Sequence, residues 1–197
     1  MRLPPDNAPA LGPPATVRSA LVSDAARIAE LGAHVFSASF GHSVEPHELA
    51  AYLKTSYSTA AIQEDLTDDF KDVLVATDAN DQIVGFGYLN CGSDEPCLAN
   101  VDHKVELQRI YIDPGAQGKG VGSLLAKELE CLARERGFRN MWLGVWKENC
   151  KLSRHTNDGV IELWVVTALP LVRLFKRILS CLKAFNDRGQ CLKPKCR

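Results

Sequence analysis

The apolar positions of this chain change between extended and helical spacing, which predicts an alternation of strands and helices. Clusters of apolar and β-branched residues predict strands, expected at 16–21, 73–76, 83–89, 103–112 and 141–146. Apolar residues three and four positions apart predict helices, expected at 25–36, from Glu45 through Leu53, at 58–66 and at 118–136. The element order is then β-α-α-β-β-β-α-β, with 58–66 as a further helical turn or two.

Cap and turn residues mark the ends of these elements. Ser23 or Asp24 would cap the first helix, and Thr59 is a candidate cap for a later one. The run D-A-N-D at 78–81 is typical of a tight hairpin turn. Gly137 would end the long helix as its first residue beyond the C-terminus. The first and the long helix each have one apolar face. The apolar face of the first helix carries Ala25, Ile28, Ala29, Leu31 and Val35. That of the long helix carries Val121, Leu124, Leu125, Leu129 and Leu132.

The composition is that of a globular protein. A chain of 197 residues suits one domain with a sizeable core, and 46% hydrophobic and 24% charged residues are ordinary values. The net charge of −1 gives no electrostatic case for nucleic acid as a partner. The 7 cysteines are scattered without a CxxC pair, which indicates neither a zinc site nor a disulfide framework. We expect reduced thiols, some of them small core residues, and a cytoplasmic location.

The beginning of the chain, 1–15, is rich in proline and lacks the apolar run of a signal peptide. We expect a disordered or extended leader there, followed by a domain at 16–151 and an atypical segment at 152–197. The histidines show no metal-ligand spacing, so no metal site is expected.

A glycine-rich loop at 117–122, Q-G-K-G-V-G, separates the strand at 103–112 from the long helix. Glycines let a backbone approach a ligand and turn its N–H groups toward it, and a helix N-terminus adds partial positive charge. The pattern therefore indicates a site for a phosphate-bearing ligand. The glycines fall as G-x-G-x-G, which excludes the dinucleotide fingerprint, and the absence of G-K-[ST] excludes a P-loop. An ordinary glycine-rich turn is the plainer alternative.

The motif Q-x-x-G-x-G directly after a strand ending I-Y-I-D-P resembles the acetyl-CoA-binding motif of the GNAT superfamily of N-acetyltransferases. Two narrower stretches are AYLKTSYSTAAIQEDL at 51–66 and the signature W-L-G-V-W-x-x-N that begins at Trp142. They resemble the bacterial PaiA-type polyamine N-acetyltransferases and their fungal relatives. The resemblance spans 16–151 and implies the GNAT fold, an α/β (α+β) architecture with a mixed central sheet flanked by helices.

The resemblance also implies site residues. Glu106, on the central strand before the loop, would be the general base, directly or through water; a solvent-facing strand residue is the alternative. The cofactor-binding positions lie on that strand, on the loop and after the last strand. The backbone of Arg109, Ile110, Tyr111 and Ile112 would pair with pantetheine and polarise the thioester. The pyrophosphate would be held by Gln117, Gly118, Lys119, Gly120, Val121 and Gly122. Asn149 would be a further contact with the cofactor. Lys119 could equally be a solvated loop residue.

Other polar and aromatic residues allow two interpretations. An acidic run, Glu64, Asp65, Asp68 and Asp69, could attract a cationic polyamine or form a solvated face, and we favour the solvated face. Trp142 and Trp146 alternate on one strand and are expected to pack rather than to bind substrate.

The resemblance ends near Lys151. The family continues with a helix carrying A-x-x-F-Y, a G-F turn and two final strands, and the tyrosine of that helix is the usual general acid. Here His155 and Thr156 stand at the phenylalanine and tyrosine positions, and a threonine hydroxyl is too short and too weakly acidic to replace a phenol. Neither final strand is recognisable, although the run at 160–169 is β-prone.

Residues 171–185 form a cationic amphipathic pattern. They could be an alternative helix on the sheet, a membrane-surface helix, or the product of a frame or splice boundary. The abrupt end of the match favours the boundary. Charged residues and Pro170 argue against a transmembrane span.

We therefore predict an acetyl-CoA-dependent N-acetyltransferase. It would act on a primary amine of a small molecule, a polyamine being one candidate, by direct attack in a ternary complex. The main rival is a catalytically impaired acyl-CoA-binding remnant that has lost the C-terminal catalytic part. A membrane-surface protein anchored through 171–185 is a weaker rival. The expected partners are acetyl-CoA and the amine, without nucleic acid or membrane, and a homodimer is left open.

Overall fold

The computed structural model describes residues 15–42, 44–95, 98–146 and 161–167. Most of the expected leader, the cationic pattern at 171–185 and the residues Asn149, His155 and Thr156 lie outside the described residues.

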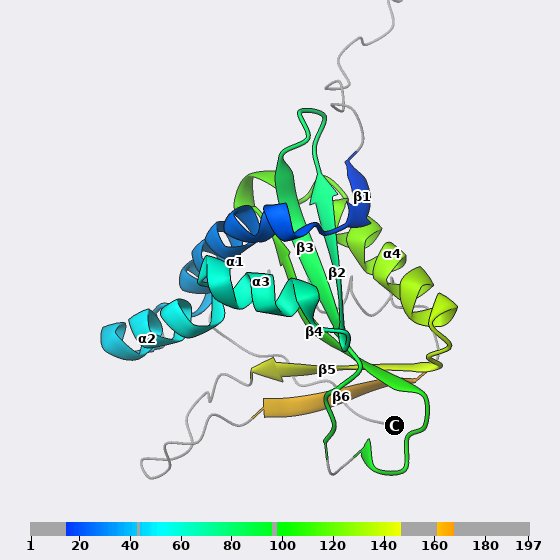
Figure 1. Ribbon diagram of the computed structural model, residues 1–197. Helices are drawn as coiled ribbons and strands as arrows, with labels where there is room; N and C mark the ends of the chain where they lie inside the picture. The colour runs from blue at the N-terminus through cyan, green and yellow to red at the C-terminus, as the bar shows by residue number, and fades with distance from the viewer. Residues whose placement is uncertain (1–14, 43, 96–97, 147–160, 168–197) are drawn as a thin grey trace, which may run out of the picture.

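One mixed sheet runs through the described part of the chain, with the strand order β1-β2-β3-β4-β5-β6 (Figure 1). Its strands are β1 Thr16–Ser19, β2 Lys71–Thr77, β3 Ile83–Asn90, β4 Lys104–Ile112, β5 Asn140–Trp146 and β6 Ile161–Thr167. Neighbouring strands are antiparallel except β4 and β5, which are parallel. A parallel pair needs a crossover connection, and helix α4, Val121–Glu135, supplies it.

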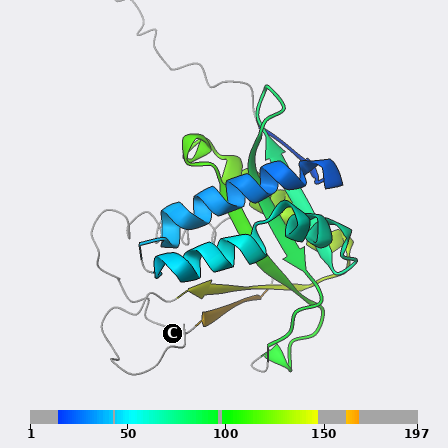
Figure 2. The same cartoon turned by 60° about the vertical axis from the view of Figure 1, so that its left-hand side comes forward.

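Helices cover both faces of the sheet (Figures 1 and 2). On one face lie α1, α2 and α3, and α4 lies on the other. The bounds of the first three are Ala25–Phe40, Pro46–Ser56 and Thr59–Thr67. Each face has its own core cluster. The α4 face includes Val105, Leu107, Val121, Leu125, Leu129, Met141 and Leu143, and the α1 face includes Ile28, Leu31, Tyr57, Ile62, Phe86 and Tyr88. The sheet flanked by helices confirms the predicted α/β class.

Helix α4 packs closely on β3 because β3 carries glycines. A Cβ at Gly87 would lie 2.5 Å from Cδ1 of Leu129, and a Cβ at Gly85 would lie 2.7 Å from Cδ1 of Ile112. The absence of side chains at these two positions lets the leucine and isoleucine fill the space against the sheet. Cγ1 of Val121, the first residue of α4, would lie 3.6 Å from the Cβ at Gly85, so this packing reaches the N-terminus of the helix.

Helix α4 begins later than the predicted 118–136. Gly118 and Gly120 have φ angles of +78° and +84°. These lie in the left-handed region, which a right-handed helix does not include, so the first helical residue is Val121.

At its other end, α4 closes as predicted. Gly137 has a φ of +85°, and the N–H of Phe138 donates to the carbonyl of Ala133 at 3.0 Å. Together these features form a Schellman motif.

The N-cap residue of α3 differs from the predicted one, whereas that of α1 is Asp24, one of the two predicted. Ser58, not Thr59, caps α3, and its Oγ accepts the N–H of Ala61 at 3.2 Å. Asp24 is the N-cap residue of α1 but makes no side-chain cap bond, because its carboxylate accepts a hydrogen bond from Arg18 at 2.7 Å. Apolar spacing located the helices, but it did not determine which polar groups form side-chain caps.

Strand β6 corrects the expectation that no final strand is present. Its backbone pairs antiparallel with β5, from Asn140↔Thr167 to Trp146↔Ile161. The β-prone run at 160–169 therefore extends the sheet by one strand beyond β5.

Two further observations bear on the sequence predictions. Cys91 and Cys131 are free and exposed, so neither is a small core residue of the kind expected. Within the described ranges, no helix combines the length and apolar character that crossing a membrane requires.

Candidate active site

Strands β4 and β5 separate in the middle of the sheet. Their parallel ladder begins at Lys104↔Asn140 and ends at Glu106↔Trp142, although β4 continues to Ile112. The two strands therefore splay apart beyond Glu106. From there on, no described strand pairs with the edge of β4 that faces β5.

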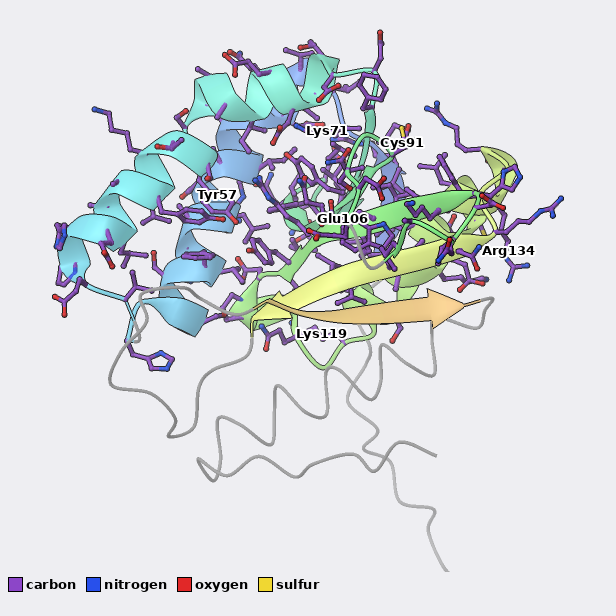
Figure 3. All side chains as sticks on the ribbon, turned by 90° about the horizontal axis from the view of Figure 1, so that it is seen from below. Tyr57, Lys71, Cys91, Glu106, Lys119 and Arg134 are labelled. Carbon is purple, nitrogen blue, oxygen red and sulfur yellow. The ribbon has the colours of Figure 1, made fainter. Side chains whose placement is uncertain are left out.

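Glu106 lies at this splay. Its neighbours Val105 and Leu107 belong to the core cluster on the α4 face. Because side chains alternate along a strand, Glu106 points to the opposite face, where α1, α2 and α3 lie. Figure 3 labels it on the side of β5 where those helices are seen.

Burial raises the pKa of the Glu106 carboxyl above its ordinary value. A hydrogen bond with Ser93 and the positive charge of Arg109 act against this shift, while the negative charge of Glu95 adds to it. A half-buried carboxyl with a raised pKa is suited to proton transfer.

A β-bulge brings Arg109 to the same face as Glu106. In a regular strand, residues three positions apart point to opposite faces. Adjacent residues of β3 pair with Leu107 and Arg109, so Gln108 is an extra residue in β4. The bulge restores the alternation and places both charged side chains under the helices.

The guanidinium of Arg109 lies against two tyrosine rings. Its Cζ is 5.2 Å from the ring centroid of Tyr57 and 5.3 Å from that of Tyr88. Nη1 donates to Oδ2 of Asp65 on α3 over a long 3.5 Å. Burial acts to lower the pKa of Arg109, but the tyrosines and Asp65 outweigh it and the pKa is raised. Arg109 is therefore a permanent cation inside this face.

Asp65 is shared between two cations. Its Oδ1 lies 2.5 Å from Nζ of Lys71 on β2, and Lys71 also lies 3.2 Å from Oδ2 of Asp68. Part of the predicted solvated acidic face is thus engaged by the protein's own cations, whereas Glu64 and Asp69 are exposed. The expectation of a solvated face is wrong for Asp65, whose side chain is 14% exposed.

Tyr57 connects the helices to β4. Its hydroxyl donates to the hydroxyl of Tyr111 at 2.9 Å, and burial raises the pKa of both phenols, so both stay protonated. A Cβ at Gly32 of α1 would lie 2.5 Å from the Tyr57 ring. The glycine lets the ring fit between α1 and the sheet.

The expected cofactor positions on β4 follow the splay directly. Residues 109–112 pair on one side with 85–88 of β3. Their other side faces the space left by the departure of β5. The backbone groups on that side can bind an extended ligand as an added strand would.

The glycine-rich loop joins this edge to α4. Nε2 of Gln117 donates to the carbonyl of Ile112 at 3.3 Å, which ties the loop to the end of β4. A Cβ at Gly118 or Gly120 would meet nothing within 4 Å, so the loop faces open space.

The N-terminus of α4 adds donors to the loop. The first N–H groups of a helix, here from Val121 and Gly122 onward, have no intrahelical acceptor and suit an anion. Lys119 is exposed, and Figure 3 labels it on the opposite side of β5 from Glu106.

Helix α1 contacts the turn before this loop. Nη2 of Arg27 lies 3.6 Å from Oδ2 of Asp113, whose Oδ1 accepts the N–H of Gly115 at 2.9 Å. The helix side of the sheet is therefore linked to the loop side through one carboxylate.

Three buried polar atoms have no hydrogen-bond partner among the described residues. They are Oη of Tyr88, Oε1 of Gln108 and Nε1 of Trp142. Trp142 is 4% exposed, as expected for a packing residue, but its indole N–H is unsatisfied. The sequence did not indicate Tyr88 or the side chain of Arg109, because the bulge and α3 bring them together. Asn149 lies outside the described residues.

Solved structures share this fold. The PaiA N-acetyltransferase of Thermoplasma acidophilum, in complex with coenzyme A, has a TM-score of 0.61 and 17% identity, covering 78% of this chain and 99% of that one. A GCN5-related N-acetyltransferase of Rhodopseudomonas palustris has a TM-score of 0.55 and 18% identity, covering 78% and 95%. At these identities the likeness concerns the fold alone.

Relatives found by sequence have a higher identity to this chain than these solved structures have. An uncharacterized N-acetyltransferase of Mycobacterium tuberculosis is 29% identical over 133 residues, which are 68% of this chain and 80% of the relative. A relative from Mycobacterium bovis gives the same values.

The model of the acetyltransferase (GNAT) family matches residues 38–154, more than half of the chain. This match confirms the family predicted from the glycine loop and the strand before it. The chain therefore belongs to the acetyltransferase (GNAT) family, whose members are N-acetyltransferases that use acetyl-CoA.

Proposed function

We propose that this protein transfers the acetyl group of acetyl-CoA to a primary amine of a small molecule, by direct attack in a ternary complex. The observation that carries the proposal is the position of Glu106, half-buried and last in the β4–β5 ladder. A carboxyl with a raised pKa at the point where two strands separate can accept a proton from an amine that attacks there.

Glu106 would be the general base, directly or through one water. The amine nitrogen bonds to the thioester carbonyl carbon and gives a proton to Glu106, while the carbonyl oxygen becomes negative. When the tetrahedral intermediate collapses, the C–S bond breaks and the coenzyme A thiolate takes a proton from solvent. A base of this kind contributes a factor of about 10² to 10⁴ in rate.

The backbone from Arg109 to Ile112 would pair with the pantetheine arm, because that edge of β4 is left by β5. A backbone N–H there would stabilise the negative carbonyl oxygen. The loop from Gln117 to Gly122, with Lys119 adding charge, would hold the pyrophosphate. Asn149 is a further proposed contact.

We also infer an acetyltransferase domain at 16–151 that acts in the cytoplasm. Strands β1 to β5 and every α-helix among the described residues fall within this range. The free thiols of Cys91 and Cys131 suit a reducing compartment. A homodimer is left open.

A polyamine is one candidate acceptor, suggested by the PaiA-type resemblance. The acidic run gives this candidate little support, because Asp65 and Asp68 already pair with Lys71. The acceptor is therefore best identified with a panel of amines that includes spermidine.

Release of free thiol from acetyl-CoA by the full-length protein tests the proposal. Glu106→Gln should lower kcat about a hundredfold or more with every acceptor used. Glu64→Gln, which changes an exposed glutamate of α3, should leave kcat unchanged. Failure to acetylate any amine would overturn the proposal. Calorimetric binding of acetyl-CoA without turnover would then favour the catalytically impaired acyl-CoA-binding protein.

A further inference from the structure

Two opposite charges share one face of the sheet beside the splay. Glu106 and Arg109 pair with Asn90 and Tyr88, which are two residues apart on β3. That register corresponds to about 7 Å along the strand. If Glu106 takes the proton of the acceptor amine, the reacting nitrogen lies near Glu106. Arg109 is then close enough to contact another group of the same small molecule.

Arg109 has unused hydrogen-bonding capacity. A guanidinium carries five N–H donors. Across the described ranges, the structure records one hydrogen bond for this side chain, the 3.5 Å contact with Asp65. Asp65 is held more closely by Lys71, at 2.5 Å. Of the two cations, Arg109 is therefore the less well satisfied.

Of the three unpartnered buried polar atoms in the described residues, Oε1 of Gln108 is an acceptor and the other two can donate. The hydroxyl of Tyr88, directly across from Arg109, is buried without a partner among the described residues, and so is the indole N–H of Trp142, across from Glu106. A buried donor without an acceptor is unfavourable. Such a face suits a ligand that brings acceptor oxygens. The ammonium groups of a polyamine bring donors alone.

We propose, building on the proposed acetyl transfer, that the acceptor is a primary amine that also carries a carboxylate, such as a free amino acid. Arg109 and the Tyr88 hydroxyl bind the carboxylate, and the amine faces Glu106. Each charge of the zwitterion then meets an opposite charge. The rings of Tyr57 and Tyr88 lie against the guanidinium and limit its movement, and a guanidinium held in this way suits bidentate binding of a carboxylate.

Matched acceptors test this inference. The kcat/KM of the full-length protein is measured by thiol release for a set of L-amino acids and for the corresponding carboxamides. We expect the carboxylate forms to be better by about tenfold or more, because a charge-assisted hydrogen bond is lost in the carboxamide. Arg109→Gln should bring the ratio of kcat/KM for the carboxylate to kcat/KM for the carboxamide toward one. Tyr88→Phe should lower this ratio severalfold. Arg136→Gln, which removes an arginine paired with Asp72, should leave the ratio unchanged.

A second variant separates recognition from folding. Asp65→Asn breaks the same ion pair from the other side and keeps the guanidinium, so the ratio should persist. If Asp65→Asn lowers the ratio as much as Arg109→Gln does, Arg109 acts through the ion pair and the inference is overturned.

The remaining outcomes distinguish this inference from the proposed acetyl transfer. A preference for spermidine or for the carboxamides overturns the carboxylate site and leaves acetyl transfer intact. If no amine is acetylated, calorimetry with the L-amino acids on the coenzyme A complex decides: binding that Arg109→Gln abolishes supports the site, and absence of binding overturns it.

Discussion

Glu106 of β4 and Trp142 of β5 are the last residues that pair across the parallel ladder between these strands. The part of β4 that β5 no longer pairs with follows immediately, and the glycine-rich loop and the N-terminus of α4 come next. A carboxyl, a strand edge that pairs with no described strand and a glycine-rich loop thus lie in sequence order along 106–122. In the proposed function, this one continuous stretch serves both the proton transfer and the cofactor.

The pH dependence of activity should reflect the burial of Glu106. Burial raises the pKa of this carboxyl, and a general base works in its deprotonated form. Activity should therefore be lost as the pH falls through a value above the ordinary range of glutamate. A profile of kcat/KM against pH checks this, and an acidic limb within or below the ordinary range would contradict the burial effect.

The same carboxyl should reduce stability at neutral pH. Its pKa is higher in the folded than in the unfolded state, so folding favours the protonated carboxyl. The stability that the protonated form provides is fully present below the unfolded pKa and is lost as the pH rises through the folded pKa. Glu106→Gln should raise the free energy of unfolding at about pH 7, with a smaller difference at about pH 4. Urea denaturation at both values measures the effect. Glu64→Gln, at an exposed position, is the control.

The glycine loop can be tested with two substitutions of the same kind. Gly120 and Gly137 have φ angles of +84° and +85°, and a Cβ at either meets nothing within 4 Å. Alanine at either position should cost about 1 to 2 kcal/mol through backbone strain alone. Gly120→Ala should in addition weaken coenzyme A binding in calorimetry, whereas Gly137→Ala, at the far end of α4, should not. Equal affinities for the two variants would place the phosphates elsewhere.

Periodic features of the sequence predicted the fold well. The apolar positions expected on the first helix, from Ala25 to Val35, are all buried, because helical spacing and one apolar face are local properties. The predicted start of α4 at Gly118 is three residues too early, because the glycines of the preceding loop have positive φ angles that apolar spacing does not indicate. The side chains around Arg109 could not be predicted, since a bulge at Gln108 and the packing of α3 bring Asp65 and Tyr88 to it.

Asp65 and Asp68 should differ in their effect on stability. Asp65 is 14% exposed and contacts both Lys71 and Arg109, so Asp65→Ala leaves a buried guanidinium without its carboxylate. Breaking such a pair should cost about 2 kcal/mol after allowance for partial exposure. Asp68 is 33% exposed and contacts Lys71 alone among these cations, so Asp68→Ala should cost less. Urea denaturation of both variants compares them, and an equal loss would mean that the Arg109 contact contributes nothing.

The close approach of α4 to β3 makes a prediction about two residues together. A Cβ at Gly87 would lie 2.5 Å from Cδ1 of Leu129, so Gly87→Ala should destabilise the protein by about 1 to 3 kcal/mol through overpacking. Leu129→Ala should cost about 3 to 5 kcal/mol through the cavity it leaves, because Leu129 is fully buried. In the double variant the new methyl group occupies part of that cavity and its clash partner is gone. The combined cost, measured by urea denaturation, should therefore be smaller than the sum by about 1 kcal/mol or more. Additive costs would mean that α4 shifts as a whole to admit the methyl group, in which case the leucine does not set the distance between helix and sheet.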